Sequence, residues 1–177
     1  MFKKVCIIGC GLIGSSLARA IKNNNLSTII VSSNRSDAVN KKVIELKIVD
    51  DSSSDTKKMA EGSDLIIIAT PLSSYENVIS KIKDCLKNGT ILTDVGSVKE
   101  NVISLVEKAV PENVSWISSH PIAGTEESGP ESGFSENEEI IIKNQSSETY
   151  LLGDFPLKAE TAAIVAVSLI QHQKGLL

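Results

Sequence analysis

The chain has 177 residues, and its 18 basic and 22 acidic side chains give a formal net charge of −4. This balance argues against a nucleic-acid-binding protein, because such proteins concentrate Lys and Arg on one face. No run reaches the roughly 18 apolar residues of a membrane-spanning helix, so we expect no membrane partner. The length is typical of one domain, and with 3% aromatic residues the core has to be built from aliphatic side chains.

The start of the chain imitates a secretory signal. Two lysines precede an apolar stretch at residues 5–8, but this stretch is far shorter than the ~7–15 apolar residues of a signal peptide. The three cysteines, Cys6, Cys10 and Cys85, are odd in number and lack a C-x-x-C spacing. We therefore expect partly buried, reduced thiols in a cytoplasmic protein.

The first part of the chain alternates short apolar runs with amphipathic segments. Residues 5–8 predict a buried strand, residues 12–21 have apolar side chains at helical spacing, and the β-branched run at 28–31 predicts a second strand. Ser36 or Asp37 can cap the next helix. Its apolar face comprises Val39, Val43, Ile44 and Leu46.

The alternation continues after a serine cluster at residues 52–54, which indicates a surface turn. Residues 65–68 form an uninterrupted apolar run that predicts a strand, and residues 77–86 predict an amphipathic helix. The remaining predicted elements are a strand at 90–92, a helix at 98–110 and a strand at 114–117.

Strands that are apolar on every residue need both faces covered, and helices on both sides of a parallel sheet satisfy that need. The sequence therefore predicts an α/β fold, a doubly wound (Rossmann-like) parallel sheet in a single domain over residues 1–134. Residues 135–177 form a divergent or truncated tail, with a candidate strand at 138–143 and a candidate helix at 157–171.

A glycine loop of the pattern G-x-G-x-x-G stands between the first predicted strand and the first helix. Gly9 allows a tight turn, Gly11 lets a diphosphate approach the backbone, and Gly14 lets the helix pack closely on the strand. The free N–H groups at the helix start, around Leu12 and Ile13, favour anionic phosphates. The alternative is a close-packed turn without a ligand.

The end of the second predicted strand bears on the choice of dinucleotide. NAD sites usually have an acidic residue there, which bonds the ribose hydroxyls. This chain has Asn34, Arg35 and Ser36 instead. A neutral Asn34 does not repel a 2′-phosphate, and Arg35 can pair with one, so the cofactor is NADP or NAD with NADP favoured. In the alternative, Arg35 lies in solvent and stacks on adenine.

Three further strand ends carry candidate site residues, because ligands of such sheets bind beyond the carboxyl ends of the strands. Thr70 and Pro71 can line the nicotinamide side, and Ser97 follows the next strand. His120 follows the last strand and titrates near neutrality, which suits it to act on a hydroxyl proton with support from Ser97. Alternatively His120 caps a turn before Pro121. We assign no metal ligands.

Three segments together resemble the prephenate/arogenate dehydrogenase family of tyrosine biosynthesis. They are Gly-Cys-Gly-Leu-Ile-Gly-Ser-Ser-Leu at 9–17, Asp-Val-Gly-Ser-Val-Lys at 94–99 and His-Pro-Ile-Ala-Gly-Thr-Glu-Glu-Ser-Gly-Pro at 120–130. The resemblance spans about residues 3–134. Its last two motifs are specific to the family, whereas many dehydrogenases share the first.

The resemblance implies an oxidative decarboxylation of prephenate to 4-hydroxyphenylpyruvate, or of arogenate to tyrosine. His120 would bond and polarise the hydroxyl at ring C4 of this small-molecule substrate, and Ser97 would support that bond. Hydride would pass from C4 to the nicotinamide as the ring carboxylate leaves as CO2. Gly124 and Thr125 correspond to the loop expected beside the substrate.

The resemblance ends near residue 134. Family members continue into a helical domain that forms the homodimer, closes the substrate cleft and supplies an arginine for the substrate, and we expect that domain to be missing here. Two alternatives stay open, the first because of the missing domain and the second because of the shared glycine loop. The chain is a non-catalytic dinucleotide-binding remnant, or it is another dehydrogenase, of the β-hydroxyacid type, which shares the glycine loop.

Overall fold

The computed structural model describes residues 1–96 without a gap. Beyond them it describes residues 106, 109–111, 113–117, 119, 129–130, 142–143 and 149–150. Six strands form the main sheet: β1 (Phe2–Ile8), β2 (Ser27–Ser33), β3 (Asp51–Ser53), β4 (Leu65–Ile68), β5 (Ile91–Asp94) and β6 (Ser115–Ile117). The described residues include four helices with complete bounds: α1 (Leu12–Asn23), α2 (Asp37–Glu45), α3 (Thr56–Ala60) and α4 (Tyr75–Ile82).

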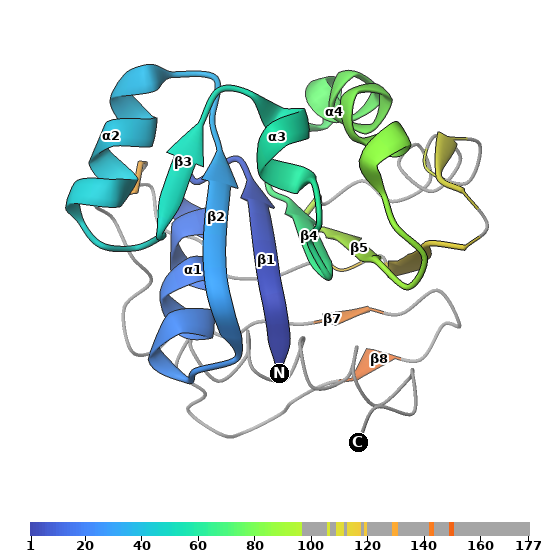
Figure 1. Cartoon of the computed structure of the whole chain (residues 1–177), viewed down its shortest axis with the longest axis horizontal. Coiled ribbons are helices and arrows are strands. Elements are labelled where there is room, and N and C mark those ends of the chain that lie inside the picture. The colour runs from blue at the N-terminus through green and yellow to red at the C-terminus, as the bar shows by residue number, and fades with distance from the viewer. Residues whose placement is uncertain are drawn as a thin grey trace.

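The six strands are all parallel and follow the order β3-β2-β1-β4-β5-β6 (Figure 1). This order confirms the predicted doubly wound sheet, whose connections run outward in both directions from the pair β1 and β4. A separate antiparallel pair joins β7 (Ile142–Lys143) to β8 (Thr149–Tyr150). In the described part of the chain, no helix is long and apolar enough to cross a membrane.

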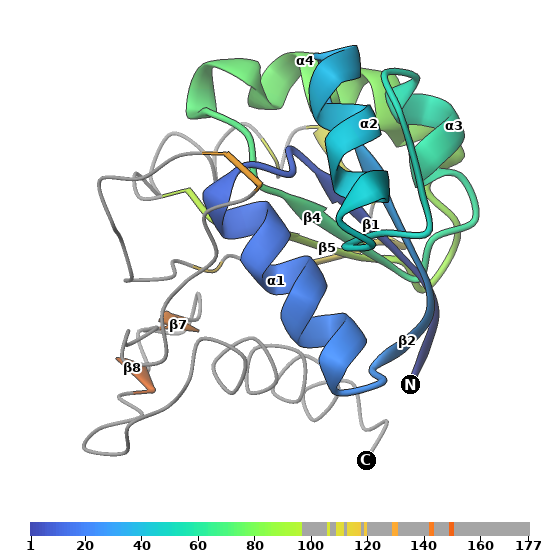
Figure 2. The same cartoon turned by 90° about the vertical axis from the view of Figure 1, so that its left-hand side faces the viewer.

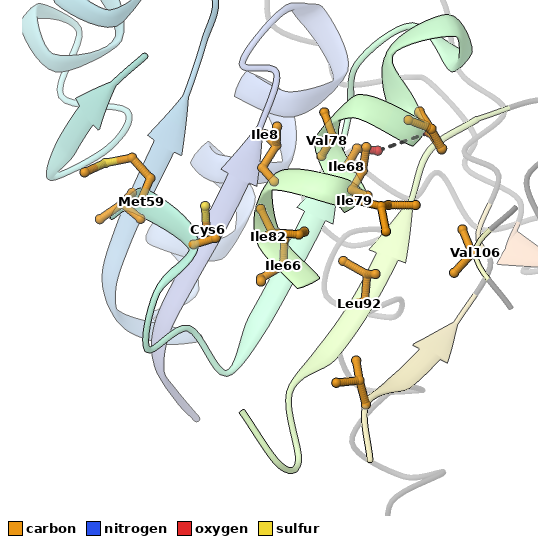
Figure 3. Packing of buried hydrophobic residues seen from close by; sticks show 14 residues of the cluster. Cys6, Ile8, Met59, Ile66, Ile68, Val78, Ile79, Ile82, Leu92 and Val106 are labelled. Carbon is orange, nitrogen blue, oxygen red and sulfur yellow. Dashed lines mark hydrogen bonds between the residues drawn. The ribbon is translucent and has the colours of Figure 1, made fainter. Parts of the chain in front are cut away.

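Each face of the sheet has its own apolar core, and successive strand residues alternate between the two. Val5 and Ile7 of β1 pack with residues of α1 and α2, whereas Cys6 and Ile8 pack with residues of α3 and α4 (Figure 3). Figure 2 shows α1 and α4 on opposite sides of the strands. All four residues of β4 are buried, which explains why the strand residues 65–68 are apolar without interruption.

The five strands predicted before residue 118 and the first helix are confirmed to within a few residues, but two elements were missed. Of the candidate strand at 138–143 only residues 142–143 are described, as β7. Residues 51–53 are the edge strand β3, and the turn predicted at 52–54 is therefore wrong for most of its length. The short helix α3 follows it, capped by the Asp55 side chain, which accepts a hydrogen bond from the Lys58 N–H. The strand β3 lacks the continuous apolar run that reveals a buried strand, because it lies at the edge of the sheet and pairs along one side only.

The predicted apolar face of α2 is half right. Val43 is buried and Val39 half-buried, whereas Ile44 and Leu46 are 42% and 36% exposed. The reason is that α2 packs over the short polar strand β3 at the sheet edge, which offers little apolar surface. Most of the helix predicted at 98–110 and the whole of the one at 157–171 lie outside the described residues.

The helix predicted at 77–86 begins and ends earlier, as α4, and continues as a 3-10 turn at Lys83–Cys85. The expectation of unpaired, partly buried cysteines is confirmed, since all three cysteines are free and Cys6 and Cys10 are buried. Burial raises the pKa of both buried thiols to about 12. They are therefore neutral at physiological pH and act as small apolar core residues.

Candidate functional site

The carboxyl ends of the central strands lie level at one edge of the sheet. Strand pairing sets Ile8 opposite both Ser33 and Ile68, and it sets Ile68 opposite Asp94. In a sheet of this order ligands bind outside these ends, between the two strands from which the connections diverge. The glycine loop leaves β1 at that place.

The glycine loop has the geometry that its sequence predicts. Gly9 has a φ of +97°, and a Cβ there would stand 2.7 Å from the carbonyl oxygen of Ala69. A Cβ on Gly14 would stand 2.2 Å from the carbonyl oxygen of Gly9. Gly11 differs, because a Cβ there would meet no atom of the described residues within 4 Å. The loop is therefore packed tightly on both sides and open only in the middle.

A cavity of about 600 Å³ lies beside this opening. Residues 9–11 of the glycine loop line it, together with residues 34–36 after β2 and residues 69–71 after β4. Its lining among the described residues contains two cations, Arg35 and Lys81, and no acidic side chain. The N–H groups of the first turn of α1, which no side chain of the described residues caps, add further positive potential. The cavity therefore suits an anionic ligand.

The three residues predicted after β2 all line the cavity, but their side chains differ in position. Asn34 is only 7% exposed, and its Oδ1 accepts a hydrogen bond from the Cys10 N–H at 2.5 Å. Arg35 and Ser36 are exposed. Ser36 stands at the N-cap of α2, as predicted, but its side chain makes no capping hydrogen bond. Asn34 thus faces the protein, and its two neighbours face the solvent side.

Thr70 and Pro71 line the opposite wall of the cavity, after β4. The Thr70 Oγ1 atom is buried and has no hydrogen-bond partner among the residues that the structure describes. A buried polar atom without a partner is unusual and is explained when a ligand supplies the partner. Together with the open space at Gly11, this atom fits a dinucleotide that extends across both strand ends.

Asp94 lies at the carboxyl end of β5 and forms hydrogen bonds with residues of three segments. Its side chain is fully buried, and its Oδ2 accepts hydrogen bonds from the Tyr75 hydroxyl at 3.2 Å and the Gly96 N–H at 2.9 Å. Its Oδ1 accepts from the Ser119 N–H at 3.3 Å, and its carbonyl oxygen accepts from the Ser119 hydroxyl. Burial, followed by the nearby Asp94 charge, raises the pKa of Tyr75, so the phenol stays a donor.

The predicted catalytic and substrate residues, Ser97, His120, Gly124 and Thr125, lie outside the described residues. The chain neighbours of the first two are described. Gly96 precedes Ser97 and Ser119 precedes His120, and both neighbours bond Asp94. The two segments that carry the predicted catalytic pair thus start from a common anchor.

Sequence reasoning missed several residues of this region. Ser54 and Thr56 line the cavity after β3, and Lys81 lines it from α4. Gly129 and Pro130, at the end of the third motif, also line it, and the Pro130 carbonyl accepts a hydrogen bond from Arg19 Nη2 at 2.7 Å. The polar residues after β3 carried a usable signal, because they follow a strand end on the same edge. Lys81 carried none, since an exposed lysine on a helix is ordinary.

Comparison with known proteins identifies the family of the chain. The family model described as prephenate dehydrogenase, nucleotide-binding domain, matches residues 17–141. The chain belongs to this family. The resemblance drawn from the three motifs is thereby confirmed at the level of the family.

Curated relatives and solved structures agree with the family. The cyclohexadienyl dehydrogenase of Zymomonas mobilis is 35% identical over 77% of this chain and 46% of its own length. The prephenate dehydrogenase of Lactococcus lactis is 32% identical over 97% of this chain and 48% of its own length. The chain therefore spans about half the length of the curated relatives it matches.

The fold of this prephenate dehydrogenase family member is also found in solved structures. The prephenate dehydrogenase from A. aeolicus, in complex with hydroxyphenyl propionate and NAD+, superposes with a TM-score of 0.75 at 20% identity, covering 97% of this chain and 57% of that one. Synechocystis arogenate dehydrogenase gives a TM-score of 0.69 at 21% identity, over 98% of this chain and 56% of the other. At these identities the likeness establishes the fold alone.

Proposed function

We propose that the chain forms the cofactor half of an NAD(P)-dependent prephenate or arogenate dehydrogenase, with residues 1–134 as its dinucleotide-binding domain. One observation carries the proposal: the cavity of about 600 Å³ opens where the middle of the glycine loop has no protein neighbour. The family model and the names of the curated relatives supply the reaction class.

Different residues around the cavity would hold different parts of the dinucleotide. The backbone of Gly11 and the first turn of α1 would hold the diphosphate, because N–H groups and the helix dipole there favour anions. Arg35 and Ser36 would hold the adenosine ribose, and Thr70 and Pro71 would line the nicotinamide. The nicotinamide, when bound, supplies the acceptor for a hydride.

NADP is the preferred form in this proposal. The acidic residue that usually bonds the ribose hydroxyls of NAD after β2 is absent, and Asn34 stands at its position. Arg35 is exposed at the cavity and can pair with the phosphate through two parallel N–H groups. Lys81, on the same cavity lining, adds a second positive charge, and Ser36 offers a hydroxyl donor.

We assign the chemistry to His120 and Ser97. A neutral His120 accepts a hydrogen bond from the substrate hydroxyl at ring C4, and it stabilises the positive charge that grows there as the hydride leaves. The electron pair of the breaking carboxylate bond enters the ring, CO2 departs, and the aromatic ring keeps the hydroxyl as a phenol. Ser97 orients the imidazole or the hydroxyl. The network around Asp94 supports this assignment, since it fixes the start of both segments.

Calorimetry and absorbance test the proposal on the chain as it stands. Titration with NADP+ and NAD+ is expected to give binding, with NADP+ tighter by about tenfold, the effect of roughly one charge-assisted contact. Prephenate or arogenate is then added, and formation of reduced cofactor is followed by absorbance. Absence of binding by both dinucleotides overturns the proposal. Full turnover by a His120→Gln variant overturns the role of His120.

A second candidate is dinucleotide binding without turnover by this chain alone. It is favoured by the fact that the chain spans about half the length of its curated relatives. Chemistry needs both reactants held within ~3–3.5 Å of each other, which a cofactor half does not achieve by itself. Binding of the dinucleotide with no binding of prephenate or arogenate supports this candidate over the first.

A further inference from the structure

Asn34 is the centre of a buried polar network that connects the glycine loop to two other elements. Its Nδ2 donates to Asn40 Oδ1 at 3.0 Å, Ser32 Oγ at 3.2 Å and Ser52 Oγ at 3.3 Å. Asn40, on α2, returns a hydrogen bond from its Nδ2 to the Asn34 carbonyl at 3.0 Å. The Ser52 hydroxyl of β3 donates to Asn40 Oδ1 at 2.7 Å. Both the side chain and the backbone of Asn34 are thereby held.

The loop is attached to this network by two consecutive N–H groups. The Gly9 N–H donates to the Ser33 carbonyl at 2.9 Å, and the Cys10 N–H donates to Asn34 Oδ1 at 2.5 Å. The next N–H groups, from Gly11 into the first turn of α1, are those that a helix start leaves available. The last residue of β2 and the residue after it therefore decide where these N–H groups point.

A carboxylate does not fit at position 34 in this arrangement. It would keep an acceptor for the Cys10 N–H, but it would place an oxygen against Asn40 Oδ1, where Asn34 now presents a donor. The position is only 7% exposed, so the new charge would also be desolvated. Buried acceptors that face each other without a proton are unfavourable.

We propose that Asn34 is a positioning residue, which holds the glycine loop in its binding geometry through the Cys10 N–H and does not itself select between NADP and NAD. The inference rests on the proposed function, and it assigns the selection to the exposed Arg35. It opposes the simple expectation from the strand-end rule, in which an acidic residue at this position bonds the ribose hydroxyls and converts the site to NAD.

The test compares Asn34→Asp, Arg35→Gln and wild type by calorimetric titration with NADP+ and with NAD+. We expect Asn34→Asp to weaken both affinities by about tenfold or more, with their ratio changed by less than about threefold. Arg35→Gln is expected to weaken NADP+ by about tenfold and to leave NAD+ nearly unchanged. Asn88→Asp, on an exposed turn at the amino edge of the sheet, controls for the added charge.

A second readout follows the loop itself. In amide NMR spectra, Asn34→Asp is expected to move the Cys10 signal strongly while the Gly62 signal, in a distant turn, stays in place. Ser52→Ala removes one partner of Asn34 from β3 and keeps the test available if Asn34→Asp does not fold. We expect it to weaken both dinucleotides by about threefold, without a change in their ratio.

The outcomes separate the two claims. Tighter NAD+ binding by Asn34→Asp, or a tenfold shift of the ratio toward NAD+, overturns the positioning role. A wild-type chain that binds neither dinucleotide overturns the proposed function, and the Cys10 signal then decides the positioning role alone. An unmoved Cys10 signal overturns that role, and a moved signal supports it.

Discussion

Two aspartates accept hydrogen bonds from backbone N–H groups at opposite ends of the parallel strands, the amino edge where the strands begin and the carboxyl edge where they end. Asp64 precedes β4 at the amino edge, where its Oδ2 accepts from the N–H groups of Lys3 at 2.7 Å and Lys4 at 3.1 Å. Its Oδ1 pairs with Lys87 Nζ at 2.9 Å. Asp94 ends β5 at the carboxyl edge, and it is fully buried.

The surroundings of the two carboxylates differ more than their hydrogen bonds do. Desolvation opposes the charge of Asp64, but the hydrogen bonds from Lys87 and from the backbone of Lys4 and Lys3 outweigh it, so the pKa of Asp64 is lowered. The donors described for the Asp94 carboxylate are a phenol and two backbone N–H groups, all neutral.

This difference suggests that Asp64 mainly stabilises the sheet, whereas Asp94 mainly holds the segments that lead to the candidate site. The amino-edge carboxylate is partly exposed and paired with a lysine, which suits a residue that closes the bottom of the strands. A buried carboxylate is costly to desolvate and is retained where its hydrogen bonds are needed. Asp94 stands where the segments toward Ser97 and His120 begin. The costly buried carboxylate therefore lies at the carboxyl edge, next to the candidate site.

The largest effect is expected from Asp94→Ala. It leaves the Gly96 N–H and the Ser119 N–H without their acceptor in a buried place, whereas the Tyr75 hydroxyl keeps the Ile68 carbonyl at 3.3 Å. At roughly 1–3 kcal/mol for each unsatisfied donor, we expect a loss of about 3 kcal/mol or more in the free energy of unfolding. Urea denaturation of Asp94→Ala and Asp64→Ala measures it. A smaller loss for Asp94→Ala than for Asp64→Ala would contradict the comparison.

Asp64→Asn is expected to cost about 1 kcal/mol at neutral pH, because the carboxylate is partly exposed. The pKa of Asp64 is lower in the folded chain than its unfolded value near ~3.9, so its contribution is complete above that pH. It is lost as the pH falls through the folded value. Urea denaturation across the acid range should therefore show the curves of wild type and variant converging. Parallel curves would show that this charge contributes nothing.

The smallest pair of effects comes from removing one neighbour of each aspartate. Tyr75→Phe removes a buried hydroxyl bonded to Asp94, and we expect it to cost about 1 kcal/mol at any salt concentration. Lys87→Met removes an ion-pair partner that is 47% exposed, and it should cost less than about 1 kcal/mol. Added salt should shrink the second effect and leave the first unchanged. Equal salt dependence would remove the distinction between the edges.

The sequence predicts the central part of this fold because both faces of its strands are covered. The four residues of β4 are apolar for that reason, and its bounds match the prediction at 65–68. The edge strand β3 lacks this signal, since Asp51, Ser52 and Ser53 are polar and pair on one side only. Edge position therefore hides a strand whose Ser52 bonds Asn34 and whose following residue, Ser54, lines the cavity.

In the candidate site, too, local sequence predicts some features and not others. The roles of Gly9 and Gly14 follow from backbone geometry, and local sequence reveals them. The inward orientation of Asn34 depends on Asn40 and Ser52, which reach it from α2 and β3. No pattern around residue 34 contains that information, because the contacts exist only after the sheet has formed.

Gly11→Ala tests the central claim, that a dinucleotide binds against bare backbone at the start of α1. The backbone at Gly11 has φ −76° and ψ −153°, and a Cβ there meets no described atom within 4 Å. The free energy of unfolding should therefore change by less than about 0.5 kcal/mol. We predict that calorimetric affinity for NADP+ nevertheless falls by at least about tenfold, because the methyl group occupies the place of the diphosphate. Unchanged NADP+ affinity in a fully folded Gly11→Ala chain would contradict the account.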